Sequence, residues 1–138
     1  MIFLNKYPSI KLDSGIRIVN YSSPHPYTFH TGEVLPACSD EVARDTKLLA
    51  NHARKKNDKG WYDISINYAL SEMQEDELIK LVDMRIIDII LVPYPVMQAL
   101  KDSPDWEIHW YSYVWDKIRV CKLHDRVTKV IRSDEFCV

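Results

Sequence analysis

The chain has 138 residues, of which 46% are hydrophobic and 28% charged, so it is long enough for one domain with a core and too short for two ordinary ones. Eighteen basic residues against twenty acidic ones leave a formal net charge of -2, which excludes a protein that binds nucleic acid through bulk positive charge. The 11% of aromatic residues and the three glycines exclude a disordered or low-complexity chain. We therefore expect a single globular domain over residues 1–138.

The cysteines and the apolar segments indicate the compartment. Cys38, Cys121 and Cys137 are odd in number and widely spaced, unlike the disulfide framework of a small secreted domain. Polar residues interrupt the N-terminus too early for a signal peptide. The longest apolar stretch, Ile86–Val92, is far shorter than the ~20 residues that a membrane span needs. We expect a soluble cytoplasmic protein without a membrane partner.

The first third of the chain predicts strands and tight connections. Ile16–Asn20 alternates and is rich in β-branched residues, which is typical of a strand. The two prolines of Ser22–Pro26 end that strand in a loop, because proline cannot donate to a ladder. Tyr27–Leu35 predicts a hairpin in which Gly32 takes a positive φ angle at the turn.

Residues Ser39–Lys56 predict a helix. Ser39 is a good N-cap, acidic residues follow it on the first turn, and Arg54–Lys56 place positive charge on the last turn, in accord with the helix dipole. The apolar positions recur at helical spacing and are Val42, Thr46, Leu49 and Ala53. Asn57–Gly60 would close this helix.

The middle of the chain predicts a strand followed by a second helix. Trp61–Tyr68 alternates cleanly between large apolar and small polar residues, so we expect a strand with one face in the core and the other face polar. Ser71–Gln74 matches the capping-box pattern, and leucines recur after it at helical spacing. The second helix should cover about Glu72–Met84.

The remaining elements complete the predicted fold. Ile86–Val92 is a continuous apolar run, typical of a strand buried on both faces at the centre of a sheet, and a short helix should follow it from Pro93 to Leu100. Three further segments predict antiparallel strands: Trp106–Trp115, Lys117–Leu123 and Val127–Ile131. We expect an α+β fold with a mixed, largely antiparallel sheet of five to seven strands and two or three helices.

The loop after the first strand is a candidate ligand-binding element. Prolines hold the hydroxyls of Ser22 and Ser23 and the imidazole of His25 in a restricted shape. Such a loop can bind an anionic or sugar-bearing ligand at little ordering cost. The alternative is that the two hydroxyls make local backbone hydrogen bonds and that His25 packs on the turn.

A basic segment supplies the second half of this candidate site. Residues 116–132 hold six basic residues against two acidic ones, a local excess of +4. In the predicted strand, Arg126 and Arg132 share one face and Lys129 lies on the other, so the arginines could clamp a phosphate or carboxylate. The alternative is an edge strand protected from aggregation by its charges. The predicted ligand-binding residues are Ser22, Ser23, His25, Arg126, Lys129 and Arg132.

Catalysis and metal binding have weaker support in the sequence. Cys38 precedes the predicted N-cap, where helix amides could lower the thiol pKa, and His25 could act as its base, but a cysteine in that place is more often a small hydrophobic residue. No Cys-x-x-Cys or His-x-x-x-His pair and no glycine-rich nucleotide loop occurs. We assign no catalytic residue, no metal and no cofactor.

The aromatic segment Trp106–Trp115 has large side chains on both faces of the predicted strand. Packing in the core is the commoner role of such residues, whereas a stacking platform for a base or a partner interface are alternatives. A homodimer through this strand is one hypothesis.

The stretch Ile18–Pro26 resembles the opening of a family of small, mostly phage-encoded proteins that begin with a Val-Asn-Leu-Thr-Pro-His-Pro-like strand and loop. Ser23, Pro24 and His25 match that motif residue by residue, and Tyr27–Leu35 resembles the hairpin that follows it. No biochemical activity is established for this family. The resemblance implies a phage or mobile-element origin and an accessory role in the cytoplasm of the host cell.

Three functional hypotheses follow. The first is an accessory protein that binds a small anionic ligand, such as a nucleotide signal of host defence, without catalysis. The second is a protein-interaction module that inhibits a host protein through its aromatic strand or its acidic helix. The third is a small enzyme that uses Cys38 or His25.

Overall fold

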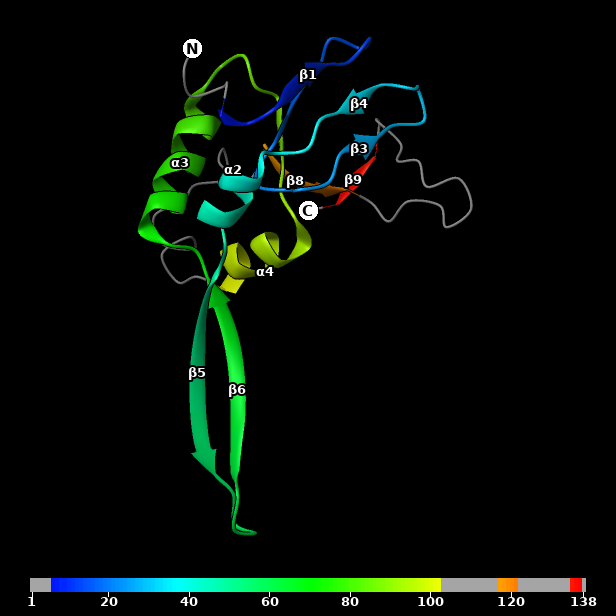
Figure 1. Ribbon diagram of the computed structural model, residues 1–138. Helices are drawn as coiled ribbons and strands as arrows, with labels where there is room; N and C mark the ends of the chain where they lie inside the picture. The colour runs from blue at the N-terminus through cyan, green and yellow to red at the C-terminus, as the bar shows by residue number, and fades with distance from the viewer. Residues whose placement is uncertain (1–5, 103–116, 122–134, 138) are drawn as a thin grey trace.

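A mixed five-stranded sheet forms the centre of the fold (Figure 1). The computed structural model describes residues 6–102, 117–121 and 135–137. The sheet order is β1 (Ser9–Lys11), β2 (Arg17–Asn20), β7 (Ile89–Leu91), β8 (Ile118–Cys121) and β9 (Phe136–Cys137). The three inner strands are parallel, and each edge strand is antiparallel to its neighbour.

Strand β7 occupies the central position that its apolar sequence predicts. Ile90 and Leu91 are fully buried, because a strand between two parallel neighbours is covered on both faces. The strand begins at Ile89 rather than at Ile86. The amide of Ile87 donates to the carbonyl of Met84 at 3.1 Å, so these residues still belong to the turn that precedes the strand.

The two faces of the sheet carry different layers. Val19 and Ile90 belong to the core cluster that includes helices α2 (Asp40–Asp45), α3 (Glu72–Asp83) and α4 (Tyr94–Asp102). On the opposite face, Ile18 and Leu91 pack with the side chains of the small hairpin β3 (Tyr27–Thr28) and β4 (Val34–Leu35). Gly32 lies in that hairpin's turn with a φ angle of 92°, as the sequence predicts.

The predicted helix over Ser39–Lys56 is wrong beyond its first two turns. Ser39 does cap a helix, but α2 ends at Asp45. The chain then forms strand β5 (Leu49–Lys56), which pairs antiparallel with β6 (Tyr62–Ala69) over eight residue pairs. Most residues of β5, among them Leu49, Ala50 and Arg54, are good helix formers in isolation. Pairing with the strongly β-prone strand β6 overrides this local preference.

The strand predicted over Trp61–Tyr68 is confirmed, but its expected core face is wrong. Strands β5 and β6 form a long hairpin that projects away from the body (Figure 1), and the side chains of both faces are exposed. We call residues 49–69 the arm. Asn57–Gly60 form its turn, with Gly60 at a φ angle of 105°, and do not close a helix.

The fold class is α+β, as predicted, with a mixed central sheet and two antiparallel hairpins. The predicted strands Trp106–Trp115 and Val127–Ile131 lie outside the described residues. The strand expected over Lys117–Leu123 is present as β8. In the part of the chain that the structure describes, no helix has the length and hydrophobicity required to cross a membrane.

A single buried amide side chain holds both ends of the arm. Ser71 and Gln74 form the predicted capping box of α3. The backbone N–H of Gln74 donates to Ser71 Oγ, and the backbone N–H of Ser71 donates to the side-chain Oε1 of Gln74 at 2.9 Å. The Gln74 side chain also donates through Nε2 to the backbone carbonyl of Thr46. Thr46 precedes β5 and Ser71 follows β6, so Gln74 ties the entry of the arm to its exit.

We predict that Gln74→Ala lowers the free energy of unfolding by about 2–4 kcal/mol, since it leaves the Thr46 carbonyl and the Ser71 amide without their partners in the interior. Urea denaturation measures this loss. Met73→Ala is the matched control, because Met73 is adjacent on α3 and half exposed, and its effect should stay within about 0.5 kcal/mol. Equal effects of the two substitutions would contradict this role of Gln74.

Candidate functional site

The loop Ser22–Pro26 is fixed by its own hydrogen bonds. Ser23 Oγ accepts from the amide of His25 at 3.2 Å and donates to the His25 carbonyl at 3.0 Å. The side chain of Asn20 accepts from the amide of Ser23 at 3.1 Å and donates to the carbonyl of Pro36 at 2.9 Å. Ser22 adopts a φ angle of 73°. The loop is therefore a rigid, locally satisfied turn.

This geometry limits what the loop can offer to a ligand. Ser22 and Ser23 are buried, and the hydroxyl of Ser23 is engaged within the turn, whereas His25 is exposed. The other half of the predicted site, Arg126, Lys129 and Arg132, lies outside the described residues. Of the six residues predicted to bind a ligand, the structure places three, and it presents one of these three to solvent.

The structure places Cys38 in the core. Its Sγ donates to the Asn20 carbonyl at 3.3 Å, and its side chain is 5% exposed. Burial raises the pKa of the thiol from about 9 to about 11, although a backbone hydrogen bond from Ser22 partly opposes this shift. The thiol is therefore protonated at neutral pH, and Cys38 has the environment of a small hydrophobic residue rather than of a nucleophile.

We predict that this buried thiol makes the free energy of unfolding decrease with pH in the alkaline range. The pKa of the thiol is higher in the folded state than in the unfolded state. The protonated thiol therefore makes its full contribution to the free energy of unfolding below about pH 9, and this contribution is lost as the pH rises toward 11. The difference in unfolding free energy between wild type and Cys38→Ala should narrow over that interval. Burial raises the pKa of Tyr7 and Tyr21 enough to keep both protonated in the folded state of either protein over this interval, and unfolded tyrosines titrate alike in both proteins, so tyrosine ionisation cancels. A difference that stays constant from pH 9 to pH 11 would contradict the assignment.

The arm has two chemically distinct faces, because side chains alternate along each strand. We define the apolar face as the even-numbered residues, in which Tyr62, Ile64, Ile66 and Tyr68 of β6 lie opposite Lys56, Arg54, His52 and Ala50 of β5. The polar face consists of the odd-numbered residues, in which Asp63, Ser65, Asn67 and Ala69 lie opposite Lys55, Ala53, Asn51 and Leu49.

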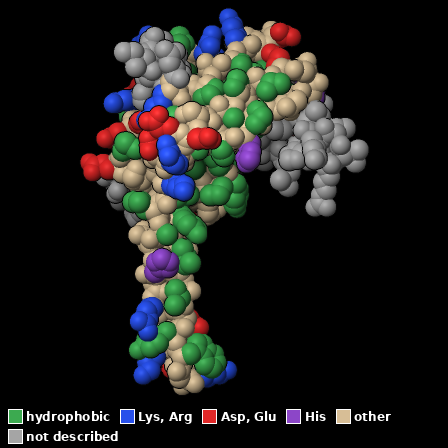
Figure 2. Space-filling view, in the orientation of Figure 1, with side chains coloured by type: hydrophobic (Ala, Val, Ile, Leu, Met, Phe, Trp, Pro, Cys, Tyr) green, Lys and Arg blue, Asp and Glu red, His purple; other side chains and the backbone are tan. Residues whose placement is uncertain are grey.

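The apolar face is open to solvent and carries positive charge. Ile64 is 63% exposed, and Tyr62, Ile66 and Tyr68 are each exposed by half or slightly more. The guanidinium of Arg54 lies 4.1 Å from the centre of the Tyr62 ring, a cation–π contact. No acidic residue belongs to this face. Figure 2 shows hydrophobic and basic side chains side by side along the arm.

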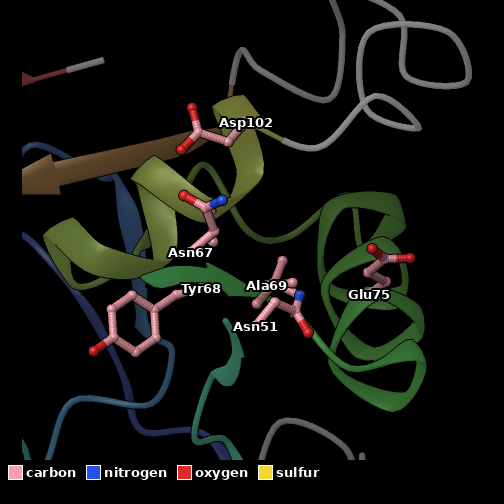
Figure 3. A pocket seen from close by; sticks show the side chains of 8 residues that line it. Asn51, Asn67, Tyr68, Ala69, Glu75 and Asp102 are labelled. Carbon is pink, nitrogen blue, oxygen red and sulfur yellow. The ribbon is translucent and has the colours of Figure 1, made fainter. Parts of the chain in front are cut away.

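A cavity of about 330 Å³ lies where the arm joins the body (Figure 3). Residues of the arm line one side of it, and Glu75 of α3 and Asp102 of α4 give its rim a negative charge. The Gln98 side chain donates to Asp102 at 3.2 Å. The lining residues are Asn51, Asn67, Tyr68, Ala69, Leu70, Glu75, Ala99 and Asp102.

The sequence contains a pattern typical of the arm's hairpin, although the helix propensity of residues 49–56 favours a different structure. Asn57–Gly60 is a run of turn residues directly before the alternating strand, and eight residues on each side of such a turn are typical of a hairpin. If Asn57–Gly60 instead closes a helix, β6 has no strand to pair with.

Among residues 6–102, 117–121 and 135–137, no three histidine, cysteine or acidic side chains gather in a way that could hold a metal ion. No protein-family model, curated protein or solved structure matches the chain.

Proposed function

We propose that the chain is a protein-interaction module that binds a partner protein through the apolar face of the arm. The observation that carries this proposal is the concentration of exposed apolar side chains. Of the ten large hydrophobic side chains exposed among the described residues, four lie together on the apolar face of the arm, and Leu49 and Trp61 add two on its other face. Contiguous apolar surface of this kind marks sites of protein interaction, whereas single exposed hydrophobic residues need no explanation.

The stability of a hairpin adds a second argument. An isolated two-stranded hairpin is at best marginally stable in water, and a third strand or a packed layer is needed to hold it. The sequence nevertheless maintains strict alternation from Tyr62 to Tyr68. A partner that packs on the apolar face would supply the missing layer and remove the four large side chains of β6 from water.

The charges indicate the chemistry of the partner. The arm holds four basic residues against two acidic ones, a net charge of +2, so the rest of the chain carries -4 of the total of -2. A complementary protein surface has an apolar centre for Ile64 and Ile66 and acidic groups opposite Arg54 and Lys56. A nucleic acid fits less well, because two aliphatic side chains occupy the middle of the face and the acidic body repels phosphate.

The resemblance at Ile18–Pro26 suggests in which cell this module acts and on what kind of partner. A phage or mobile-element accessory protein that binds a protein of the host cytoplasm would act as its inhibitor by occupying one of its surfaces. Binding by shape and charge needs no catalytic group. This role therefore agrees with the protonated thiol of Cys38.

The arm is a better supported binding element than the loop Ser22–Pro26. In that loop the Ser23 hydroxyl is engaged and His25 alone is exposed among the three predicted residues. Binding of a small anionic ligand stays a prediction that depends on Arg126, Lys129 and Arg132. Thermal stabilisation by a panel of nucleotides is its test.

The proposal is tested by photocrosslinking in cells that carry the chain. A photoreactive phenylalanine analogue at position 64, on the apolar face, should give a covalent adduct with one protein of discrete mass other than a second copy of the chain. The same analogue at position 65, on the polar face, is the control and should give no such adduct. Adducts with another protein that form equally at both positions, or adducts that contain nucleic acid, would overturn the proposal.

The affinity of variants for the purified partner then measures how much the apolar face contributes to binding. Burial of an isoleucine side chain is worth about 1.5–3 kcal/mol, so Ile64→Ser should raise the Kd by about tenfold to a hundredfold. Ala53→Ser, on the polar face of the adjacent strand, should leave the Kd unchanged within about twofold. Titration calorimetry measures both values, and equal affinities for the two variants would count against the apolar face as the binding surface.

A further inference from the structure

We propose that the outer edge of β6 pairs with β6 of a second copy of this chain, antiparallel, about a twofold axis that passes at Ser65. This inference uses the backbone edge of the arm rather than its apolar face, so it goes beyond the proposed function and stands independently of it. It rests on the direction of the backbone groups, on the order of residues along β6, and on the chemistry of the two ends of the arm.

The backbone groups on the outer side of β6 have no neighbouring strand among the described residues, since β5 and β6 form a two-stranded sheet. The amide of Asn57 donates to the carbonyl of Trp61 at 2.7 Å, which continues the register of the ladder. By alternation, the odd-numbered residues of β6 direct their N–H and C=O groups toward β5. The even-numbered residues Tyr62, Ile64, Ile66 and Tyr68 direct theirs outward.

The residue order of β6 is a near palindrome about Ser65. Tyr-Asp-Ile-Ser-Ile-Asn-Tyr, residues 62–68, has the same residue types in both directions except for Asp63 and Asn67. In an antiparallel pair centred on Ser65, Tyr62 lies opposite Tyr68 of the second copy and Ile64 lies opposite Ile66 of the second copy. The same even-numbered residues carry the outward backbone groups, so like side chains and free hydrogen-bonding groups meet in one register.

The two edge strands of the arm differ in how well their side chains discourage pairing with a further strand. Strand β5 carries Arg54, Lys55 and Lys56, and charged residues, lysine above all, discourage pairing at an edge. Strand β6 carries Asp63 as its one charge and is otherwise β-branched, aromatic or small. An eight-residue edge of this composition favours strand addition, so the unprotected edge is the edge that the palindrome makes self-complementary.

The ends of the arm are complementary in the same arrangement. Continuing the register places Trp61 of the second copy opposite Ala69, on the polar face that also lines the cavity. Trp61 is 53% exposed in the single chain, and its indole Nε1 donates to Asp63 at 3.0 Å. Lys59 of the second copy follows, toward the rim formed by Glu75 and Asp102. Lys59 at the tip of each arm thus approaches the acidic rim at the base of the other arm.

Pairing of this kind solves the stability problem of the arm without covering its apolar face. The two hairpins become a four-stranded sheet in the order β5, β6, β6, β5, which exceeds the three strands needed for independent stability. The tyrosines and isoleucines of both copies then form one continuous platform, bordered on each side by Arg54 and Lys56. A partner protein would meet a surface twice as wide as that of one arm.

Disulfide trapping tests the register directly. At the twofold axis, Ser65 of the two copies forms a non-hydrogen-bonded pair with Cα atoms about 4.5 Å apart, which is within the range that a disulfide bridges. Mild oxidation of Ser65→Cys should give a covalent dimer. Ala53→Cys is the matched control, because position 53 lies on the same face but would be about 14 Å from its counterpart. Equal trapping of both variants would overturn the register.

Sedimentation of the full chain tests the association itself. Wild type should sediment as a dimer at about 100 µM, and Ser65→Lys, which places two like charges opposite each other on the axis, should weaken dimerisation at least about tenfold. Ala53→Lys should remain a dimer. A monomeric wild type, or equal behaviour of the two lysine variants, overturns the proposal. Retention of the position-64 adduct by monomeric Ser65→Lys would show that partner binding survives loss of the dimer.

Discussion

The side chain of Gln74 fixes the point at which both strands of the arm leave the body. It is fully buried, and it holds the carbonyl that precedes β5 and the amide that follows β6. Because a buried amide without partners is costly, these two junctions stay together and the chain between them forms a closed loop, which the pairing of β5 with β6 makes a hairpin. Both strands therefore leave the body from one fixed point, and the cavity lined by Glu75 and Asp102 lies at that point.

The arm contradicts the rule that a chain buries the apolar face of its own strand. Tyr62, Ile64, Ile66 and Tyr68 alternate as in a strand that packs on a core, yet the described residues of the body leave them exposed. Two surfaces are left open by this arrangement: a face that needs a packed layer and an edge that needs a strand. The proposed partner protein occupies the face, and the second copy occupies the edge. The two associations use different atoms and are compatible.

Local signals in the sequence predicted the body of the fold well. The capping box at Ser71 and the glycine turn at Gly32 act over a few residues, and the structure confirms both. The apolar run Ile86–Val92 predicts the central strand, of which the structure confirms Ile89–Leu91. Strand β5 could not be recognised in this way, because Leu49–Lys56 is helical by propensity and becomes a strand through its pairing with β6. Alternation identified β6 correctly, but alternation alone does not say whether the layer against the apolar face belongs to the same chain.

The candidate site shows the same limit. Rigidity of the Ser22–Pro26 loop follows from its prolines and its hydroxyls, and the structure confirms that rigidity through the contacts of Asn20 and Ser23. The direction of a hydroxyl depends on such contacts with other segments, so a loop that looked poised for a ligand from its composition holds its Ser23 hydroxyl within itself.

Hydroxyl-radical footprinting of the purified chain tests most directly whether the arm stands free of the body. Tyr7 and Tyr21, which are fully buried, serve as internal references for protection. We predict that Tyr62 and Tyr68 are oxidised much faster than Tyr7 and Tyr21, in the monomer and in the edge-paired dimer alike. Protection of both arm tyrosines to the level of Tyr7 and Tyr21 would mean that the apolar face packs on the body, and it would rule out a free-standing arm.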